Sequence, residues 1–486
     1  MLTLGIDLGT SSVKLVLMGD DDELIAAASR PLTVQRPQPG YSEQEPAAWW
    51  TATCAGLDEL KAKAGAAMAE TAAIAISSQM HGATLLDAKG EVLRPCILWN
   101  DGRSVAECAE LEAAWPALQR VTGNLAMPGF TAPKLLWVRK HEPEVFAHAA
   151  HVLLPKAWLG WKLSGQMVEE MSDASGTLWL DVGARRWSAE GLKACGLTPE
   201  QMPRLVEGNA VASVLNAENT ARWGFRRPPL LAGGAGDNAA GAVGVGAVRP
   251  GDAFVSLGTS GVLWATTAGF APNPKRAVHA FCHALPDTWH QMGVILSAAS
   301  ALAWWAGVCG RPEAELVAEA QALGDAHSKV FFAPYLAGER TPHNDSAVRG
   351  GFAQLASDTS RAAMTQAVLE GVGFALRDCR QALADAGTAL HEAALIGGGS
   401  RSAHWAQTLA DQLGITLHQV AESEHGAAAG AARLARMAAG EGIEVARPAR
   451  RLHSFEPVPA AAARHAERHL RWQRLYRYAH ELGAPL

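Results

Sequence analysis

Two stretches of the chain carry the residue types that bind phosphate, and they share one pattern. Residues 5–14 read G-I-D-L-G-T-S-S-V-K, and the apolar residues on either side predict a β-hairpin with the polar residues at its tip. At such a tip, Gly9 lets the backbone approach an anion closely, and the hydroxyl groups after it add hydrogen-bond donors. Asp7 can hold a divalent cation there, directly or through water. An ordinary polar hairpin turn is the alternative interpretation.

The pattern returns in the second half of the chain. Residues 8–11 and 257–260 both read L-G-T-S, at an offset of 249 residues in a chain of 486. An offset of about half the chain predicts two similar halves, not a solenoid of short repeats. Asp7 has no acidic counterpart, because Ser256 takes its place in the second copy. One carboxylate with a phosphate loop on either side predicts a nucleotide held between two domains. Chance recurrence in a glycine-rich chain is the alternative.

A glycine-rich turn at residues 233–238, G-G-A-G-D-N, carries the candidate catalytic base. Residues 228–232 predict a strand before it, and a helix rich in alanine and glycine follows to residue 248. A helix N-terminus stabilises a carboxylate and the glycines admit a ligand. Asp237 therefore suits a base that orients a hydroxyl in phosphoryl transfer, with Asn238 as a neighbouring ligand of that hydroxyl. The simpler interpretation is that Asp237 only caps the helix.

Other nucleotide-binding motifs fit the chain less well. Gly234-x-Gly236-x-x-Ala239 matches the dinucleotide fingerprint, which would make the protein an oxidoreductase. That fingerprint belongs after the first strand of a βαβ unit and needs an acidic residue about 20 positions later. Here the turn follows many predicted strands, and Asp252 comes too soon. No G-K-[ST] occurs in the chain, which excludes a Walker-type P-loop.

Polar residues at strand ends are further binding candidates. Residues 73–78 predict a buried strand that runs into Q-M-H-G at 79–82, and I-L-W-N-D-G-R at 97–103 ends another apolar run. Residues 394–396 predict a strand before G-G-G-S at 397–400, where an adenosine or a phosphate can approach the backbone. Surface turns without a ligand are the alternatives.

The remaining pattern predicts an α/β chain of two domains. We expect a third antiparallel strand at residues 24–33 and helices at 45–64, 127–141, 361–384, 403–413 and 461–482. Residues 155–224 are rich in tryptophan and are expected to be irregular, and R-P-G-D at 249–252 is the predicted linker. The predicted domains are residues 1–248 and 252–440. A helical C-terminal extension follows at 441–486.

Composition and charge exclude several classes of protein. The chain has 42 Lys and Arg against 48 Asp and Glu, a formal net charge of −6, and no long basic run, so we expect no nucleic-acid partner. The N-terminus lacks the charged region of a secretory signal, and the 7 scattered cysteines fit neither a disulfide framework nor a zinc site. The uncharged residues 292–310 reach the length of a membrane span, but a strand at 291–296 and a buried helix at 298–308 explain them better. We expect a cytoplasmic protein without a membrane segment.

Taken in order, the motifs resemble those of the FGGY family of carbohydrate kinases. The resemblance extends over essentially the whole chain. The motifs that carry it are the two L-G-T-S loops, G-G-A-G-D-N, G-F-T-A-P-K-L-L-W-V-R-K-H at 129–141 and I-G-G-G-S-R-S at 396–402. Three further motifs are most similar to those of the family members that act on D-xylulose: Q-M-H-G, I-L-W-N-D-G-R, and G-E-R-T-P-H at 338–343. Glycerol kinases have Q-R-E where this chain has Q-M-H. The family loop G-V-F-F-G-L appears as G-G-F-A-Q-L at 350–355, so no contact is assigned to it.

The resemblance implies an actin-like ATPase fold, with two RNase H-like domains and a cleft between them. The domain at 1–248 would bind the sugar and the domain at 252–440 would bind ATP. It also implies ATP and Mg²⁺, and transfer of the γ-phosphoryl group to O5 of acyclic D-xylulose. Asp237 would be the general base, and Asp7 would hold Mg²⁺ through water. The sugar would contact Met80, His81, Asp237 and Asn238. The nucleotide would contact Thr10, Ser11, Ser12 and Lys14 in one loop, Gly258, Thr259 and Ser260 in the other, and Gly397, Gly398 and Gly399 near the adenosine.

Two alternatives to this function stay open in the sequence. One is a kinase of another ketose or polyol, such as ribulose, because one or two pocket residues separate such substrates. The other is an actin-like nucleotide switch that binds partner proteins. The strand-end cluster around His81 and the lack of a long C-terminal partner-binding region argue against the switch. As a kinase, the protein would have a small-molecule sugar and ATP as partners, and we expect a homodimer.

Overall fold

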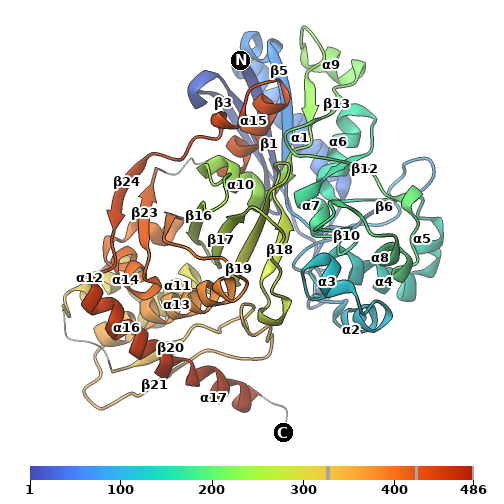
Figure 1. The fold of residues 1–486 in the computed structure, drawn as a ribbon. Coiled ribbons are helices and arrows are strands. Elements are labelled where there is room, and N and C mark those ends of the chain that lie inside the picture. The colour runs from blue at the N-terminus through green and yellow to red at the C-terminus, as the bar shows by residue number, and fades with distance from the viewer. Residues whose placement is uncertain (325–328, 422–424, 484–486) are drawn as a thin grey trace.

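The computed structural model describes residues 1–324, 329–421 and 425–483, and two mixed β-sheets organise this part of the protein (Figure 1). The first sheet contains β1 (Leu2–Leu8), β2 (Ser12–Met18), β3 (Leu24–Pro31), β5 (Thr71–Ser78), β13 (Val211–Val214), β14 (Leu230–Ala232) and β15 (Ala235–Gly236). The second sheet contains β16 (Ala253–Leu257), β17 (Gly261–Thr267), β18 (His279–Cys282), β19 (Trp289–Ile295), β22 (Glu392–Ile396), β23 (Thr416–Val420) and β24 (Arg451–Phe455).

The two sheets repeat one order of strands. The first runs β3-β2-β1-β5-β14-β13, and the second runs β19-β17-β16-β22-β23-β24, with β18 as an additional edge strand beside β19. In each of these orders, three antiparallel strands come first. Two strands follow that run parallel to the first strand of the hairpin, which is β1 in one sheet and β16 in the other. An antiparallel edge strand comes last. The two L-G-T-S motifs lie at the tips of the equivalent hairpins β1–β2 and β16–β17. The predicted similarity of the two halves is therefore confirmed.

Helices cover both faces of the first sheet. On one face, Trp49 of α1 (Pro46–Ala69) belongs to the buried cluster that contains Leu4 and Ile6 of β1. On the other face lies α15 (Gly426–Ala438), which comes back from the second half of the chain and packs beside α10 (Asp237–Val245). A Cβ atom on Gly5 would lie 1.9 Å from the carbonyl oxygen of Ala428, so this approach of α15 to β1 requires glycine.

The second sheet packs against helices that include α13 (Arg361–Ala384) and α14 (Ala403–Leu413), and α11 (Ala299–Cys309) packs on α13. The bounds of these three helices follow the predicted ones closely. A further helix, α12 (Glu313–Gln321), also packs on α13 and was not predicted. The uncharged segment 292–310 forms the end of β19 and the whole of α11, as expected. None of the helices in the described ranges is long and apolar enough to cross a membrane.

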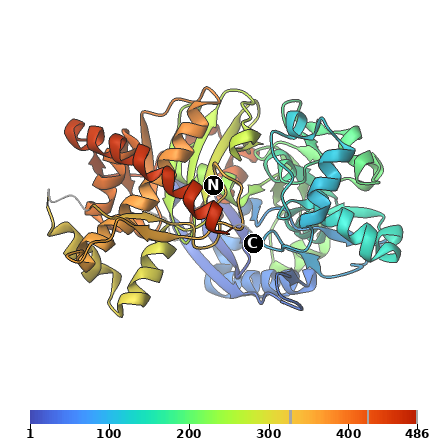
Figure 2. The ribbon, with the colours of Figure 1, turned by 90° about the horizontal axis from the view of Figure 1, so that it is seen from below.

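The chain between β5 and β14 forms a lobe of short elements, and Figure 2 shows this lobe and the C-terminal half on opposite sides of the N-terminal strands. Its helices are α2 (Val105–Ala114), α3 (Leu118–Thr122), α4 (Thr131–His141), α5 (Pro143–His148), α6 (Pro155–Ser164), α7 (Met171–Ser175), α8 (Ala189–Ala194) and α9 (Ala217–Trp223). Its short strands are β6 (Thr84–Leu86), β7 (Cys96–Ile97), β8 (His151–Leu153), β9 (Val168–Glu170), β10 (Leu180–Asp181), β11 (Arg186–Trp187) and β12 (Arg204–Val206), and β7 pairs with β4 (Glu43–Gln44). The expectation that residues 155–224 are irregular was wrong. Elements this short show no sustained periodicity in the sequence.

The C-terminal segment is more than a helical extension. It contributes β24 to the second sheet, next to β23. The single helix expected at 461–482 was wrong, because two helices occur there, α16 (Pro459–Trp472) and α17 (Arg474–Gly483). The break follows Trp472, which is buried and donates from Nε1 to the carbonyl oxygen of Phe332 at 2.7 Å. Phe332 lies in β20 (Phe331–Ala333), which pairs with β21 (Gly351–Ala353).

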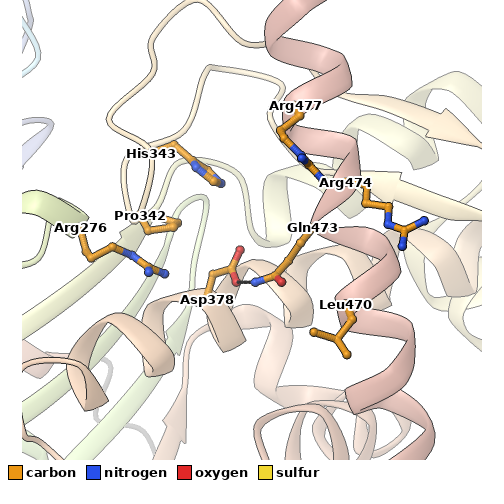
Figure 3. A pocket seen from close by; sticks show the side chains of 8 residues that line it. All are labelled: Arg276, Pro342, His343, Asp378, Leu470, Gln473, Arg474 and Arg477. Carbon is orange, nitrogen blue, oxygen red and sulfur yellow. Dashed lines mark hydrogen bonds between the residues drawn. The ribbon is translucent and has the colours of Figure 1, made fainter.

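Asp378 of α13 fastens the C-terminal helices to the second half (Figure 3). Its Oδ1 atom accepts hydrogen bonds from Nε2 of His469 at 2.9 Å and from Nε2 of Gln473 at 2.8 Å. Asp378 and Gln473 border a depression of about 490 Å³, in which Arg276, Pro342, His343, Leu470, Arg474 and Arg477 are the other lining residues. Both Asp378 and His469 are buried, and Asp378 supplies the acceptor for Nε2 of His469.

We expect Asp378→Ala to lower the free energy of unfolding by about 1–3 kcal/mol, because the substitution leaves buried His469 without its acceptor. Urea or thermal denaturation measures this loss. The control is Asp385→Ala, which removes a more exposed carboxylate that pairs with Arg276 and should change stability by about 0.5 kcal/mol or less. Equal losses in the two variants would contradict the docking role of Asp378.

Candidate active site

Asp237 is the first residue of α10 and follows the short strand β15 directly. Its Oδ1 atom accepts hydrogen bonds from the backbone N–H of Asn238 at 2.7 Å and from Nδ2 of Asn238 at 2.9 Å. Among the residues that the structure describes, no group donates to Oδ2, so this oxygen can accept a proton. Burial and the negative charge of Asp7 raise the pKa of Asp237 to about 6. A carboxylate with this pKa is a competent base near neutral pH.

Asp7 lies near the end of β1, which pairs with β5 on the side opposite to β15. The parallel register of β1 and β5 sets Asp7 beside Ser77, whose Oγ donates to Oδ1 of Asp7 at 3.1 Å. Burial raises the pKa of Asp7, and the Ser77 hydrogen bond and the charge of Lys14 act in the opposite direction. The negative charge of Asp7 also raises the pKa of Asp237, so the two carboxylates are close enough to interact electrostatically.

Asp7 and Asp237 fit a magnesium site in which the phosphates of a nucleotide supply the remaining ligands. Two buried carboxylates leave negative charge that a divalent cation would offset. The residues that the structure describes contain no group of three or more His, Cys, Asp or Glu able to hold a metal. Mg²⁺ usually keeps several water ligands and binds through one or two carboxylates together with substrate phosphates. Asp7 is suited to be such a protein ligand.

The turn before Asp237 is held by a buried ionic network that sequence reasoning missed. Nζ of Lys156 donates to the carbonyl oxygen of Gly233 at 3.1 Å and forms a salt bridge with Glu169. Oε1 of Glu170 accepts from the backbone N–H of Gly236 at 3.2 Å. Gly234 has a φ of 76°, and its Cβ atom would lie 2.1 Å from a backbone oxygen of β5. The glycines are therefore needed for the turn itself, and the network fixes where α10 begins.

Met80 and His81 lie beside this turn, after the end of β5. Met80 is buried, and a Cβ atom on Gly236 would lie 2.8 Å from its sulfur atom. Nδ1 of His81 lies 2.8 Å from the carbonyl oxygen of Gly176, which can only accept, so Nδ1 carries the hydrogen. Nε2 of His81 is therefore a hydrogen-bond acceptor. Burial lowers the pKa of His81 to about 3, which keeps the imidazole neutral.

Lys134 of α4 holds the backbone of His81 in an uncommon conformation. His81 has a φ of 73°, in the left-handed region that non-glycine residues rarely adopt. Nζ of Lys134 donates to the carbonyl oxygen of His81 at 2.9 Å and to that of Gly129 at 2.7 Å. Burial lowers the pKa of Lys134 to about 7. The motif G-F-T-A-P-K thus positions His81, a role that its sequence did not indicate.

The first hairpin tip is anchored to the same lobe. Oγ1 of Thr10 donates to Oε1 of Gln79 at 2.9 Å and accepts from Nε1 of Trp99 at 3.0 Å. The hydroxyl hydrogen of Thr10 is thus already used within the protein. Ser11 is exposed and Ser12 is half-buried at the start of β2. Lys14 is exposed and lines a groove with Ala27, Ala28, Ser29, Glu59, Lys63 and His425. The phosphate contacts of these four residues stay predictions.

The second hairpin tip and the Gly397–Gly399 turn form another group, within the second half. Backbone N–H groups at the start of α11 donate to the carbonyl oxygens of Gly258 and Thr259. Gly397 has a φ of 91°, and its Cβ atom would lie 2.7 Å from the backbone of Leu257. Gly398, Thr259 and Ser260 are exposed. These residues are available to a nucleotide, and their contacts with it stay predictions.

The predicted site residues therefore fall into two groups. Asp7, Met80, His81, Asp237 and Asn238 lie around the ends of β1, β5 and β15 in the first half. The glycine-rich turns lie at the ends of β16 and β22 in the second half. Within the described ranges, no hydrogen bond joins the first hairpin tip to the second. A ligand that contacts both tips would connect the two halves.

Comparisons with known proteins agree with this division. Residues 2–244 match the N-terminal domain of the FGGY family of carbohydrate kinases, and residues 253–439 match its C-terminal domain. The chain is 49% identical over 437 residues to the xylulose kinase of Escherichia coli (strain K12), with 90% of each chain covered. It is 35% identical over 440 residues to the xylulose kinase of Bacillus subtilis (strain 168), covering 90% of this chain and 88% of that protein.

Solved structures are similar over nearly the full length. The crystal structure of a xyloylose kinase from Brucella ovis has a TM-score of 0.96 and 49% identity, and covers 99% of this chain and 100% of its own. The xylulose kinase from Rhodospirillum rubrum has a TM-score of 0.93 and 29% identity, and covers 99% of this chain and 100% of its own. The predicted fold class, two α/β domains of the actin-like sugar kinase type, is confirmed by these similarities.

Proposed function

The chain belongs to the FGGY family of carbohydrate kinases, and we propose that it transfers the γ-phosphoryl group of ATP to O5 of D-xylulose with Asp237 as the general base. The single observation that carries the assignment of the base is Oδ2 of Asp237, to which none of the described residues donates, on a carboxyl with a pKa of about 6 beside Met80 and His81. The similarity to xylulose kinases supports the choice of sugar.

In this mechanism, each polar group has one task. Oδ2 of Asp237 accepts the hydrogen of the O5 hydroxyl while O5 attacks the γ-phosphorus of ATP, and ADP leaves. Asn238 holds Oδ1 of Asp237 with two N–H groups and so keeps Oδ2 pointed to the substrate. Nε2 of His81 accepts a hydrogen bond from a hydroxyl further along the sugar. Phosphoryl transfer needs mainly such positioning and charge stabilisation.

Asp7 would hold Mg²⁺ together with water and the nucleotide phosphates. Bound there, the cation would neutralise charge that develops on the phosphate oxygens. The protein's own contribution is the buried carboxylate of Asp7, kept in place by Ser77. Hairpin tips at Gly9 and Gly258 would supply backbone N–H groups to the phosphates from the two halves.

A coupled assay for ADP tests the proposed function against a nucleotide switch. A kinase releases ADP at a rate that depends strongly on the sugar, and we expect D-xylulose to raise that rate at least tenfold over ATP alone. ATP hydrolysis that is the same with and without any ketose or polyol would contradict the proposal and favour the switch.

The pKa of Asp237 predicts the acid limit of activity. The base must be deprotonated, so kcat/KM for the sugar should fall about tenfold per pH unit below pH 6, where an ordinary aspartate would remain charged to about pH 4. Initial rates between pH 5 and about pH 8 measure this fall in kcat/KM, and circular dichroism at each pH confirms that the fold persists. Constant kcat/KM down to about pH 4.5 in a folded enzyme would contradict the raised pKa.

A further inference from the structure

Arg340, in the motif G-E-R-T-P-H, is a cation largely enclosed by the protein. Within the described ranges it forms no salt bridge, and its guanidinium Nη1 donates at 3.4 Å to Nε2 of His279. The adjacent carboxyl of Glu339 accepts instead from the backbone N–H groups of Leu296 at 3.0 Å and of Arg340 at 2.8 Å. Part of Arg340 remains accessible, although the surrounding protein lowers its pKa. An enclosed guanidinium in this state has donors left for a ligand.

The first half of the chain orients His279 toward Arg340. Nδ2 of Asn124 donates to the carbonyl oxygens of Thr122 at 2.8 Å and Ala280 at 3.0 Å, so Oδ1 of Asn124 is its acceptor. Nδ1 of His279 lies 3.1 Å from this Oδ1 and therefore carries the hydrogen. Nε2 of His279 then accepts from Arg340. A neutral imidazole thus holds the guanidinium without cancelling its charge.

Arg340 lies on the His81 side of the proposed sugar site. The ring of Phe130 contacts those of both histidines, with centroids 4.9 Å from His81 and 5.6 Å from His279. Phe281 stacks on His279 at 5.6 Å and lies 6.3 Å from His81. Met80, the residue before His81, packs closely against Gly236, which precedes Asp237. A sugar with O5 at Asp237 that runs along Met80 to His81 therefore has its carbonyl end near Arg340.

We propose that Arg340 is a further substrate-binding residue, contributed by the second domain, that donates a hydrogen bond to the C2 carbonyl oxygen of the ketose. A guanidinium can only donate hydrogen bonds and a carbonyl oxygen can only accept them, so the two groups are complementary. A hydroxyl can donate as well as accept and therefore does not need a pure donor as its partner. His279 and Asn124 are positioning residues for Arg340. The proposal rests on the proposed function, because it takes the ketose to be bound with O5 at Asp237.

The test compares Arg340→Gln with Arg276→Gln, the same substitution at a more exposed arginine that pairs with Asp385. Loss of a charged hydrogen bond should raise KM for D-xylulose about 10- to 100-fold in Arg340→Gln, with KM for ATP changed less than about twofold. Arg276→Gln should match the wild type in both constants. Thermal stabilisation by D-xylulose alone should disappear in Arg340→Gln and persist in Arg276→Gln. His279→Ala should show the same pattern with a smaller rise in KM for the sugar.

A second arm uses 1-deoxy-D-xylulose, which keeps the C2 carbonyl and lacks the O1 hydroxyl. An equal loss of kcat/KM with both sugars supports the carbonyl contact, whereas a loss confined to D-xylulose overturns it. Equal increases in KM for sugar and ATP, or no change in either, would also overturn the proposal. If the wild type prefers another ketose, the proposed function fails by itself, and the Arg340 comparison is made with that ketose. The two failures are therefore distinguishable.

Discussion

Asp237→Asn should lower kcat by about 10²–10⁴, the usual effect of losing a general base. Asparagine has nearly the same shape and can still accept from Asn238 through its amide oxygen, but it cannot take the proton of O5. The fold and the binding of ATP should therefore persist. Steady-state kinetics measure the loss, and isothermal titration with a non-hydrolysable ATP analogue measures the binding.

The matched control for Asp237→Asn is Asp358→Asn, the same substitution at an exposed carboxylate of the second half. We expect this control to keep wild-type kcat and KM values. If Asp237→Asn retains more than about a third of wild-type kcat, far above the range for a lost base, Asp237 is not the base.

Asp7→Asn should lower kcat by about 10²–10³ and raise the Mg²⁺ concentration needed for half-maximal rate. The reason is that a metal-bound phosphoryl oxygen gains several kcal/mol of charge stabilisation, and a neutral amide is a poorer ligand for Mg²⁺. Ser77 can still donate to the amide oxygen of the variant, so we expect no loss of fold. Rates measured across a Mg²⁺ titration at saturating ATP and sugar test this expectation.

Two controls separate a metal role of Asp7 from a structural one. Ser77→Ala removes the hydroxyl that donates to Asp7 and should change the Mg²⁺ dependence much less than Asp7→Asn. The melting temperature of Asp7→Asn should remain close to that of the wild type. An unchanged Mg²⁺ requirement in Asp7→Asn would contradict the assignment of Asp7.

The fold could be predicted where local pattern and tertiary packing agree. The hairpins at the two L-G-T-S motifs, the strand before Q-M-H-G and the long helix α13 all have uninterrupted apolar periodicity, and each occurs as expected. The prediction was wrong where short elements are stabilised by distant contacts. Residues 155–224 fold into helices of ten residues or fewer, and the C-terminal helix breaks at Gln473 after Trp472 is anchored to β20.

The candidate site divides in a similar way. Asp7 and Asp237 could be singled out because glycines and a strand end accompany them in the sequence. The residues that hold the site in place are remote in the sequence from the groups they bind, and the motifs around them did not indicate this role. Lys134 lies 53 residues from the backbone oxygen of His81 that it binds, and Arg340 lies 61 residues from His279. Only the fold brings such partners together.

The identity of the sugar and of the phosphorylated oxygen is the central claim, and product analysis on a substrate panel tests it most directly. The purified enzyme is assayed with D-xylulose, D-ribulose, L-xylulose, xylitol and glycerol, and the product of the best substrate is examined by phosphorus–proton correlation NMR. We expect D-xylulose to have the highest kcat/KM and the phosphate to be on O5. A tenfold preference for D-ribulose or glycerol, or a phosphate on any other oxygen of D-xylulose, would contradict the account.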